Sequence, residues 1–118
     1  MATTQHQSDP TRMLPLTAVV FSILAALAEG EKHGYAIMKW AARAEGGGLA
    51  MGPGTLYGSL DRMLQSRLVE ETGSTDDERR RYYRITSFGS RVLVAEAERL
   101  RRFIGAARRN GSLERIRA

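Results

Sequence analysis

Apolar residues between positions 15 and 30 recur at the spacing of an amphipathic helix. They form one stripe, made of Leu16, Val19, Val20, Ile23, Leu24 and Leu27. Pro15 suits the first turn of such a helix, because its missing N–H is not needed there. Gly30 directly follows the stripe and is typical of a helix C-cap. The pattern therefore predicts a first helix that begins at Pro15 and ends before Gly30.

Two further helices are predicted before position 68. After a tight connection at EKHG, a helix spans residues 35–44, and its inner face consists of Ile37, Trp40 and Ala41. Residues 45–54 contain five glycines and one proline, which indicates a loop. A third helix begins near Pro53 or Thr55 and runs to about Arg67.

The pattern then changes to one that predicts a β-hairpin and a final helix. Residues 68–72 form a short strand, GSTDDE supplies the turn, and RRYYRIT returns with Tyr83 and Ile85 on one face. A long helix follows over residues 88–109, with Thr86 or Ser87 as its cap.

This order of elements predicts a mainly α fold with a small β-hairpin. It is the layout of a winged helix-turn-helix domain, expected over residues 14–86, followed by a dimerisation helix over 87–109. Residues 1–13 are polar and lack periodicity, which predicts a flexible arm. Residues 110–118 are expected to form a tail, with Gly111 as a helix stop.

The third helix has one face of unusual composition. Its core side consists of Leu56, Leu60, Met63 and Leu64. Its opposite side consists of Thr55, Gly58, Ser59, Arg62 and Gln65, flanked by Tyr57 and Asp61. An ordinary solvated helix would carry Glu and Lys there. A mid-helix glycine costs about 1 kcal/mol relative to Ala, which makes sense if a ligand must approach the backbone closely.

The major groove of DNA admits one helix with small or forked polar side chains. Arg62 can donate two hydrogen bonds to a guanine, and the N–H groups at the start of the helix can hold a phosphate oxygen. The candidate DNA-binding residues of this helix are Pro53, Thr55, Tyr57, Gly58, Ser59 and Arg62. The alternative is that this face packs against another subunit.

Charge is distributed unevenly along the chain, whose formal net charge is +5. Residues 1–78 carry six Lys or Arg and ten acidic residues, whereas residues 79–109 carry ten Arg and two Glu. A clustered basic surface favours a polyanion such as DNA. Arg79, Arg80 and Arg81 of the wing are the candidate phosphate contacts. Alternatively, they form salt bridges with the neighbouring acidic residues of the wing tip, Asp76, Asp77 and Glu78.

The final helix carries apolar residues at heptad spacing. The candidate dimerisation residues are Leu93, Ala97, Leu100, Phe103, Ile104 and Ala107. Such a stripe on one helix usually packs against the same helix of a second subunit and forms a homodimer. Alternatively, the helix could fold back on the first helix of its own chain. A two-fold dimer would hold two third helices about 34 Å apart and predicts a palindromic operator.

Composition favours a binding protein over an enzyme. The chain has no cysteine and two histidines, His6 and His33, and no His/carboxylate cluster has metal spacing, so neither a metal nor a cofactor is expected. No phosphate-binding loop, secretory signal or membrane-spanning run is recognisable. We expect a cytoplasmic protein.

Three blocks in register resemble the PadR family of bacterial transcriptional regulators. They are HGYAI at 33–37, PGTLYGSLDRML at 53–64 and RRRYYRITSFGSRVL at 79–93, and the resemblance spans roughly residues 14–109. The short last helix resembles the small subgroup, with one dimerisation helix per chain. The resemblance implies a dimeric, DNA-binding repressor, and some family members release DNA when an aromatic or cationic drug binds at the dimer interface.

Two positions depart from the family pattern. Drug-binding members stack the ligand on a tryptophan of the last helix, whereas here Trp40 lies on the second helix and the last helix offers Phe103. Trp40 and Phe103 are therefore the candidate ligand pocket, for a small hydrophobic or aromatic effector. Arg67 stands where the family commonly has a glycine. The alternative function is a winged-helix protein-interaction module that does not bind DNA, favoured by the acidic N-terminal portion and wing tip.

Overall fold

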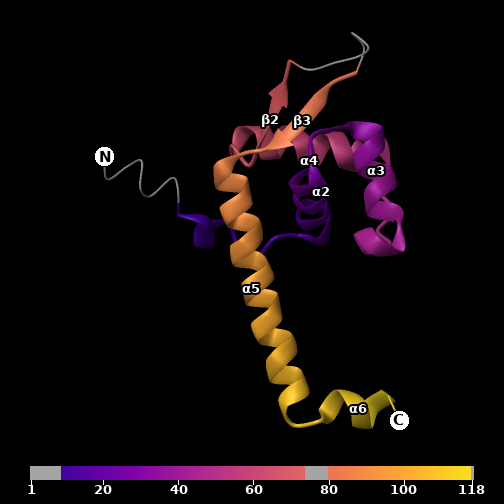
Figure 1. The fold of residues 1–118 in the computed structure, drawn as a ribbon, viewed down its shortest axis with the longest axis vertical. Helices are drawn as coiled ribbons and strands as arrows, with labels where there is room; N and C mark the ends of the chain where they lie inside the picture. Colours follow the sequence, from indigo (N-terminus) through magenta and orange to yellow (C-terminus); the bar gives the residue numbers. More distant parts are fainter. Residues whose placement is uncertain (1–8, 74–79, 118) are drawn as a thin grey trace.

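The computed structural model describes residues 9–73 and 80–117 of the 118-residue chain. The described elements are η1 (Pro10–Met13), α2 (Ala18–Glu29), β1 (Lys32–His33), α3 (Gly34–Ala42), η2 (Ala44–Gly46), α4 (Pro53–Gln65), β2 (Val69–Thr72), β3 (Tyr82–Ile85), α5 (Ser87–Arg109) and α6 (Ser112–Arg117). Helices α2, α3 and α4 form a body with the sheet at one end, and α5 runs away from it to α6 at the other end (Figure 1). The fold is the predicted mainly helical winged helix.

The first long helix, α2, begins three residues later than predicted. The Thr17 hydroxyl caps it by accepting from the Val20 N–H at 3.1 Å. Pro15 therefore lies outside the helix, and its predicted place in the first turn is wrong. A hydroxyl satisfies a free N–H at the helix start, which proline cannot do. Gly30 ends the helix as predicted, and its N–H donates to the Leu27 carbonyl at 3.1 Å.

The core lies where α2, α3 and α4 meet the sheet and the start of α5. Its buried members are Ile23, Leu24, Ala26, Leu27, Ile37, Leu56, Leu60, Met63, Leu68, Val69, Tyr83 and Val92. The predicted core faces of the second and third helices are confirmed by the burial of Ile37, Leu56 and Leu60. Trp40 differs, because it is only partly buried at the edge of this core.

The sheet has three strands where the sequence predicted two. Strand β3 lies in the centre, antiparallel to β2 on one side and to the two-residue β1 on the other. Lys32 pairs with Tyr83 and His33 with Tyr82. The His33 ring also caps α3, because its Nδ1 accepts from the Ala36 N–H at 3.2 Å. The connection predicted as a simple turn thus joins the wing to the start of α3.

Helix α5 begins at the predicted cap. The Thr86 hydroxyl accepts from the Gly89 N–H at 2.9 Å. Gly89 is buried against the Leu68 carbonyl oxygen, which would lie 2.1 Å from a Cβ at this position. Only glycine allows the first turn of α5 to approach Leu68, the residue before β2, this closely.

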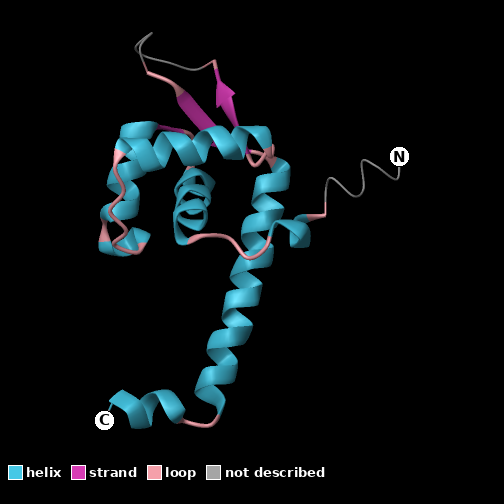
Figure 2. Ribbon diagram, turned by 180° about the vertical axis from the view of Figure 1, so that it is seen from behind, coloured by secondary structure: helices cyan, strands magenta, loops and turns pink. Residues whose placement is uncertain are grey.

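Two terminal segments are more ordered than predicted. The described end of the expected arm forms η1, whose Met13 packs against the core, and η1 lies beside α5 (Figure 2). Residues 1–8 lie outside the described residues. The expected tail contains α6, separated from α5 by Gly111 at φ 72°. Gly111 is therefore the predicted helix stop, although the chain resumes a helix after it.

Candidate nucleic-acid interface

Helix α4 lies at the same end of the molecule as β2 and β3 (Figure 1). Pro53, Thr55 and Arg62 are exposed on it, and Tyr57 keeps 42% of its surface exposed. A Cβ placed on Gly58 would meet only the Arg62 guanidinium, at 3.7 Å. The backbone at the centre of this face is therefore open to close approach, as the sequence predicted.

Ser59 does not belong to the open face. Its side chain is only 3% exposed, and its hydroxyl accepts a hydrogen bond from Arg62 Nη2 at 3.4 Å. The assignment of Ser59 as a base contact is therefore wrong. At about 100° per residue, Ser59 stands only about 40° from Met63, so it borders the core stripe. Its hydroxyl instead orients the Arg62 side chain.

Two arginines of the wing, Arg81 and Arg84, have carboxylate partners on the neighbouring strand β2. Arg84 contacts Glu70 at 2.8 Å, and Arg81 contacts Glu71 at 3.3 Å. Both pairs are solvent-exposed, so each contributes little to stability. Arg79 and the acidic tip, Asp76 to Glu78, lie outside the described residues, so the predicted pairing with the tip stays a prediction.

Strand β3 carries two adjacent tyrosines, Tyr82 and Tyr83, and only Tyr83 lies in the core. Tyr83 is 1% exposed, and its pKa is raised because burial and the nearby Glu71 carboxylate both disfavour the phenolate. Tyr82 is half-buried and lies edge-on to the His33 ring at 5.4 Å between centroids. The alternation of core and outer residues on this strand is confirmed.

A cleft of about 410 Å³ separates the start of α3 from α4 and the wing. It is lined by His33, Gly34, Tyr35, Tyr57, Arg80 and Arg81. A Cβ on Gly34 would lie 2.3 Å from the Tyr57 hydroxyl. Glycine at this position therefore lets Tyr57 lie over the first turn of α3. Two guanidinium groups and two phenol hydroxyls around one cleft form a donor-rich site that suits a phosphate oxygen.

Tyr35 was missed as a site residue by the sequence analysis. Its side chain is 62% exposed, with the Lys39 ammonium 5.5 Å from the ring centroid. The signal was present in the HGYAI block, in which Tyr35 directly follows the glycine that contacts Tyr57.

The C-terminal half of α5 carries an exposed apolar stripe. Leu100, Phe103 and Ile104 are 36%, 62% and 51% exposed, and Ala97 and Ala107 are also exposed. Leu93 differs, because it is half-buried and packs against the core of its own chain. The alternative that this helix folds back on the first helix therefore holds for its beginning only.

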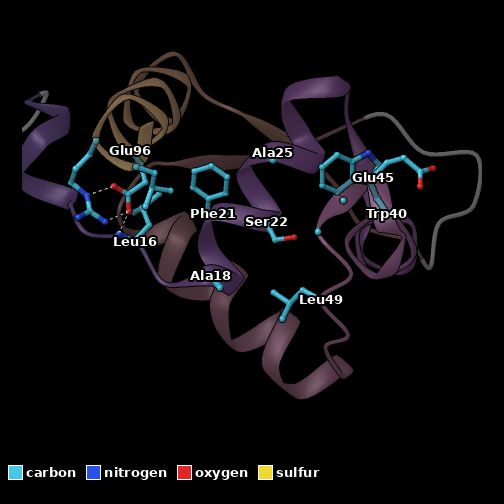
Figure 3. A pocket seen from close by; sticks show the side chains of 13 residues that line it. Leu16, Ala18, Phe21, Ser22, Ala25, Trp40, Glu45, Leu49 and Glu96 are labelled. Carbon is cyan, nitrogen blue, oxygen red and sulfur yellow. Dashed lines mark hydrogen bonds and ion pairs between the residues drawn. The ribbon is translucent and has the colours of Figure 1, made fainter. Parts of the chain in front are cut away.

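A cavity of about 630 Å³ lies between α2, α5 and the segment that follows α3 (Figure 3). Trp40 lines it, as predicted, but Phe103 does not. Helix α5 contributes Glu96, Arg99 and Leu100 instead. Phe103 points elsewhere and stacks with Arg99, whose guanidinium lies 5.2 Å from the ring centroid. Trp40 and Phe103 thus do not share a cavity within one chain, and the predicted ligand pocket of these two residues stays a prediction.

Residues 9–73 and 80–117 also bear on metal binding and membrane insertion. No group of three or more His, Asp or Glu side chains within them is placed to hold a metal ion. Nor does this part of the chain contain a helix with the length and apolar character needed to cross a membrane.

Three helices, a wing and an exposed α4 beside a basic cleft define a winged-helix transcriptional regulator. The sequence profile of the Transcriptional regulator PadR-like family matches residues 23–95, so the chain belongs to this family. This family consists of transcriptional regulators and not of enzymes.

Known proteins agree with this assignment. RosR of H. salinarum is 31% identical with a TM-score of 0.69, over 92% of each chain. A PadR family transcription regulator from Clostridium difficile R20291 has a TM-score of 0.68 at 22% identity, over 79% of this chain and 97% of that one. PadR of Bacillus subtilis, solved in complex with operator DNA, has a TM-score of 0.60 at 19% identity, over 69% of this chain and 46% of that one. The last two show likeness of fold.

One sequence relative is much longer than this chain. An uncharacterized 37.1 kDa protein in transposon TN4556 of Streptomyces fradiae is 41% identical over 86 residues. The match covers 70% of this chain and 23% of that protein.

Proposed function

We propose that the protein is a dimeric repressor that recognises a palindromic operator in the cytoplasm. The observation that carries this proposal is the open face of α4, with Thr55 and Arg62 exposed beside the arginine-lined cleft. An exposed helix with few charges, next to separate phosphate donors, suits the division between base readout and backbone positioning in protein–DNA contacts.

In this proposal α4 reads bases and the wing anchors the phosphates. Arg62 donates hydrogen bonds to a guanine in the major groove. The Ser59 hydroxyl accepts a hydrogen bond from Arg62 and so orients the Arg62 guanidinium. The cleft at Tyr57 receives a backbone phosphate, with Arg80 and Arg81 as its charged donors. Arg79 would extend the same anchoring along the wing.

The stripe on α5 is proposed as the dimer contact. It consists of Leu93, Ala97, Leu100, Phe103, Ile104 and Ala107, most of them exposed in the single chain. Pairing through this stripe gives a two-fold axis, and two α4 helices about one DNA turn apart would read a palindrome. We also propose that a small ligand regulates DNA binding.

Binding to the protein's own promoter DNA at several salt concentrations tests the proposal. Fluorescence anisotropy with labelled promoter and scrambled duplexes should give preference for the promoter. The affinity should fall steeply as salt rises, because phosphate contacts release counterions. Equal, weak binding to both duplexes would instead support the winged-helix protein-interaction module.

A further inference from the structure

The open face of α4 has an acidic residue near its middle. Ser59 is only 3% exposed, so the open face is rotated away from it, toward Asp61, which is exposed. At about 100° per residue, Asp61 stands about 160° around the helix from Met63, a member of the core. Asp61 therefore faces away from the core, near the centre of the open face rather than at its flank.

Two glycines leave the backbone beside Asp61 uncovered. A Cβ on Gly54 would meet no atom within 4 Å, and one on Gly58 would meet only the Arg62 guanidinium, at 3.7 Å. Gly54 lies about two turns before Asp61 and within about 20° of it around the helix, while Gly58 stands between Asp61 and Arg62. A ligand can therefore approach the helix axis closely enough for the short Asp61 side chain to reach it.

The charge of Asp61 is not compensated within the described residues. The exposed carboxylates of β2, Glu70 and Glu71, each contact an arginine of the wing. Asp61, in contrast, has no hydrogen bond or ion pair with any described residue. A carboxylate on a surface that meets phosphates repels them and weakens binding. This cost is offset only where Asp61 gains a hydrogen-bond donor from the bound DNA.

The base edges of the major groove identify that donor. Cytosine presents the N4 amino group, whereas guanine and thymine present acceptors, and the amino group of adenine lies beside its N7 acceptor. A carboxylate only accepts hydrogen bonds, so cytosine is the base that suits it best. We propose that Asp61 is a specificity-determining residue that accepts a hydrogen bond from the N4 amino group of one cytosine in each half-site. This inference rests on the proposed function, because it assigns a base contact to the same face of α4.

The roles of Asp61 and Arg62 then differ. Adjacent residues stand about 100° apart on a helix, so the two side chains contact different bases. Arg62 attracts any DNA through its charge, whereas Asp61 repels every duplex that offers it no donor. Asp61 therefore increases sequence specificity and lowers affinity for DNA in general. An exposed acid with a purely structural role would have neither effect.

Selection of duplexes from a random library by the full chain tests the base contact. The library carries about 20 random base pairs, which is enough for two half-sites one helical turn apart. The unmodified protein should select one cytosine in each half-site besides the guanine of Arg62. Asp61→Ala should reduce the cytosine preference roughly tenfold and keep the guanine preference. Asp61→Asn should select adenine at the same position, because an amide pairs with adenine N6 and N7.

The affinity for a scrambled duplex gives a second readout. Measured by anisotropy at one fixed salt concentration, both Asp61 variants should bind this duplex at least roughly twofold more tightly, because a like charge has been removed. Glu98→Gln removes the same charge from an exposed position in the part of α5 that runs away from α4 (Figure 1) and should change neither readout. The melting temperature of the Asp61 variants should equal that of the unmodified protein.

Three results would overturn the role of Asp61. They are a cytosine preference that survives in Asp61→Ala, a loss of preference that is equal at every position, and weaker binding of the scrambled duplex by both variants. If the unmodified protein selects the guanine and no cytosine, the inference fails while the proposed function stands. If the unmodified protein selects no sequence at all, both fail.

Discussion

The backbone N–H of Leu16 donates to the carboxylate of Glu96 at 2.7 Å, although the two residues are 80 positions apart in the chain. Glu96 is 1% exposed, and its charge is balanced by Arg99. The contact fixes the segment before α2 to the middle of α5. This buried carboxylate therefore helps to set the direction of α5 relative to the winged-helix body, together with the apolar packing of Val92, and would also affect the separation of two α4 helices in a dimer.

Replacing Glu96 by Gln should lower the free energy of unfolding by about 1–3 kcal/mol. The amide keeps the shape but loses the charge that Arg99 balances. Urea denaturation followed by circular dichroism measures the change. Glu98→Gln is the matched control, because the exposed Glu98 pairs with Arg101 at the same spacing. The control should change stability by less than about 1 kcal/mol, and equal losses in both variants would contradict a special role for Glu96.

Glu96 also predicts a response to acid. Hydrogen bonds from Arg99 and the Leu16 N–H hold its pKa below the ordinary value of 4.5. The unfolded chain therefore binds a proton more readily than the native one, and the stability from this group is present above pH 4.5 and lost as the pH falls through the native pKa. Unfolding measured between pH 7 and 3 should show a shallower loss for Glu96→Gln than for the unmodified protein.

The sequence could not distinguish Glu96 from Glu98. Each glutamate precedes an arginine by three positions on the same helix, and both pairs form. Only packing against η1 and Leu16 buries one of them. The core face of α4 could be predicted because its stripe repeats over several turns, whereas β1 has two residues, too few to show a period. Ser59 was misassigned because a small residue at the edge of a stripe fits either face.

The contact between Gly89 and the Leu68 backbone predicts that one added methyl group strongly destabilises the protein. In Gly89→Ala the new Cβ would lie 2.1 Å from the Leu68 carbonyl oxygen, which is backbone and cannot move aside cheaply. The free energy of unfolding should fall by about 3 kcal/mol or more. In contrast, Gly105→Ala has no atom within 4 Å and should gain about 0.5–1 kcal/mol from better helix propensity. Thermal unfolding of both variants would refute this contrast if they behaved alike.

If α4 reads bases and the wing anchors phosphates, substitutions of Arg62 and Arg80 should affect DNA binding in different ways. Arg62→Ala should relax base preference at one position of each half-site and cost about 1–3 kcal/mol there. Arg80→Ala should weaken all sequences alike and reduce the salt slope by about 1. Anisotropy titrations with single-base operator variants at three salt concentrations separate the two effects. Arg102→Ala, which removes the same charge from an exposed position in the part of α5 that runs away from α4, is the control. Identical behaviour of both arginine variants would refute the division.

If the exposed stripe on α5 is the dimer contact, a charge placed in it should weaken dimerisation. Ile104→Glu places a charge in the centre of the stripe and should weaken dimerisation at least roughly tenfold. Ala106→Glu adds the same charge about 200° around the helix and should leave dimerisation unchanged. Sedimentation equilibrium over a range of protein concentrations measures both constants.

The same two variants connect assembly to DNA recognition. A full palindrome gains affinity because two linked α4 helices bind together. Ile104→Glu should therefore lose more affinity for the palindrome than for a single half-site, whereas Ala106→Glu should lose neither. If Ile104→Glu sediments as a monomer yet binds the palindrome as tightly as the unmodified protein, the stripe does not couple the two reading helices. The proposed dimer would then have to form through another surface.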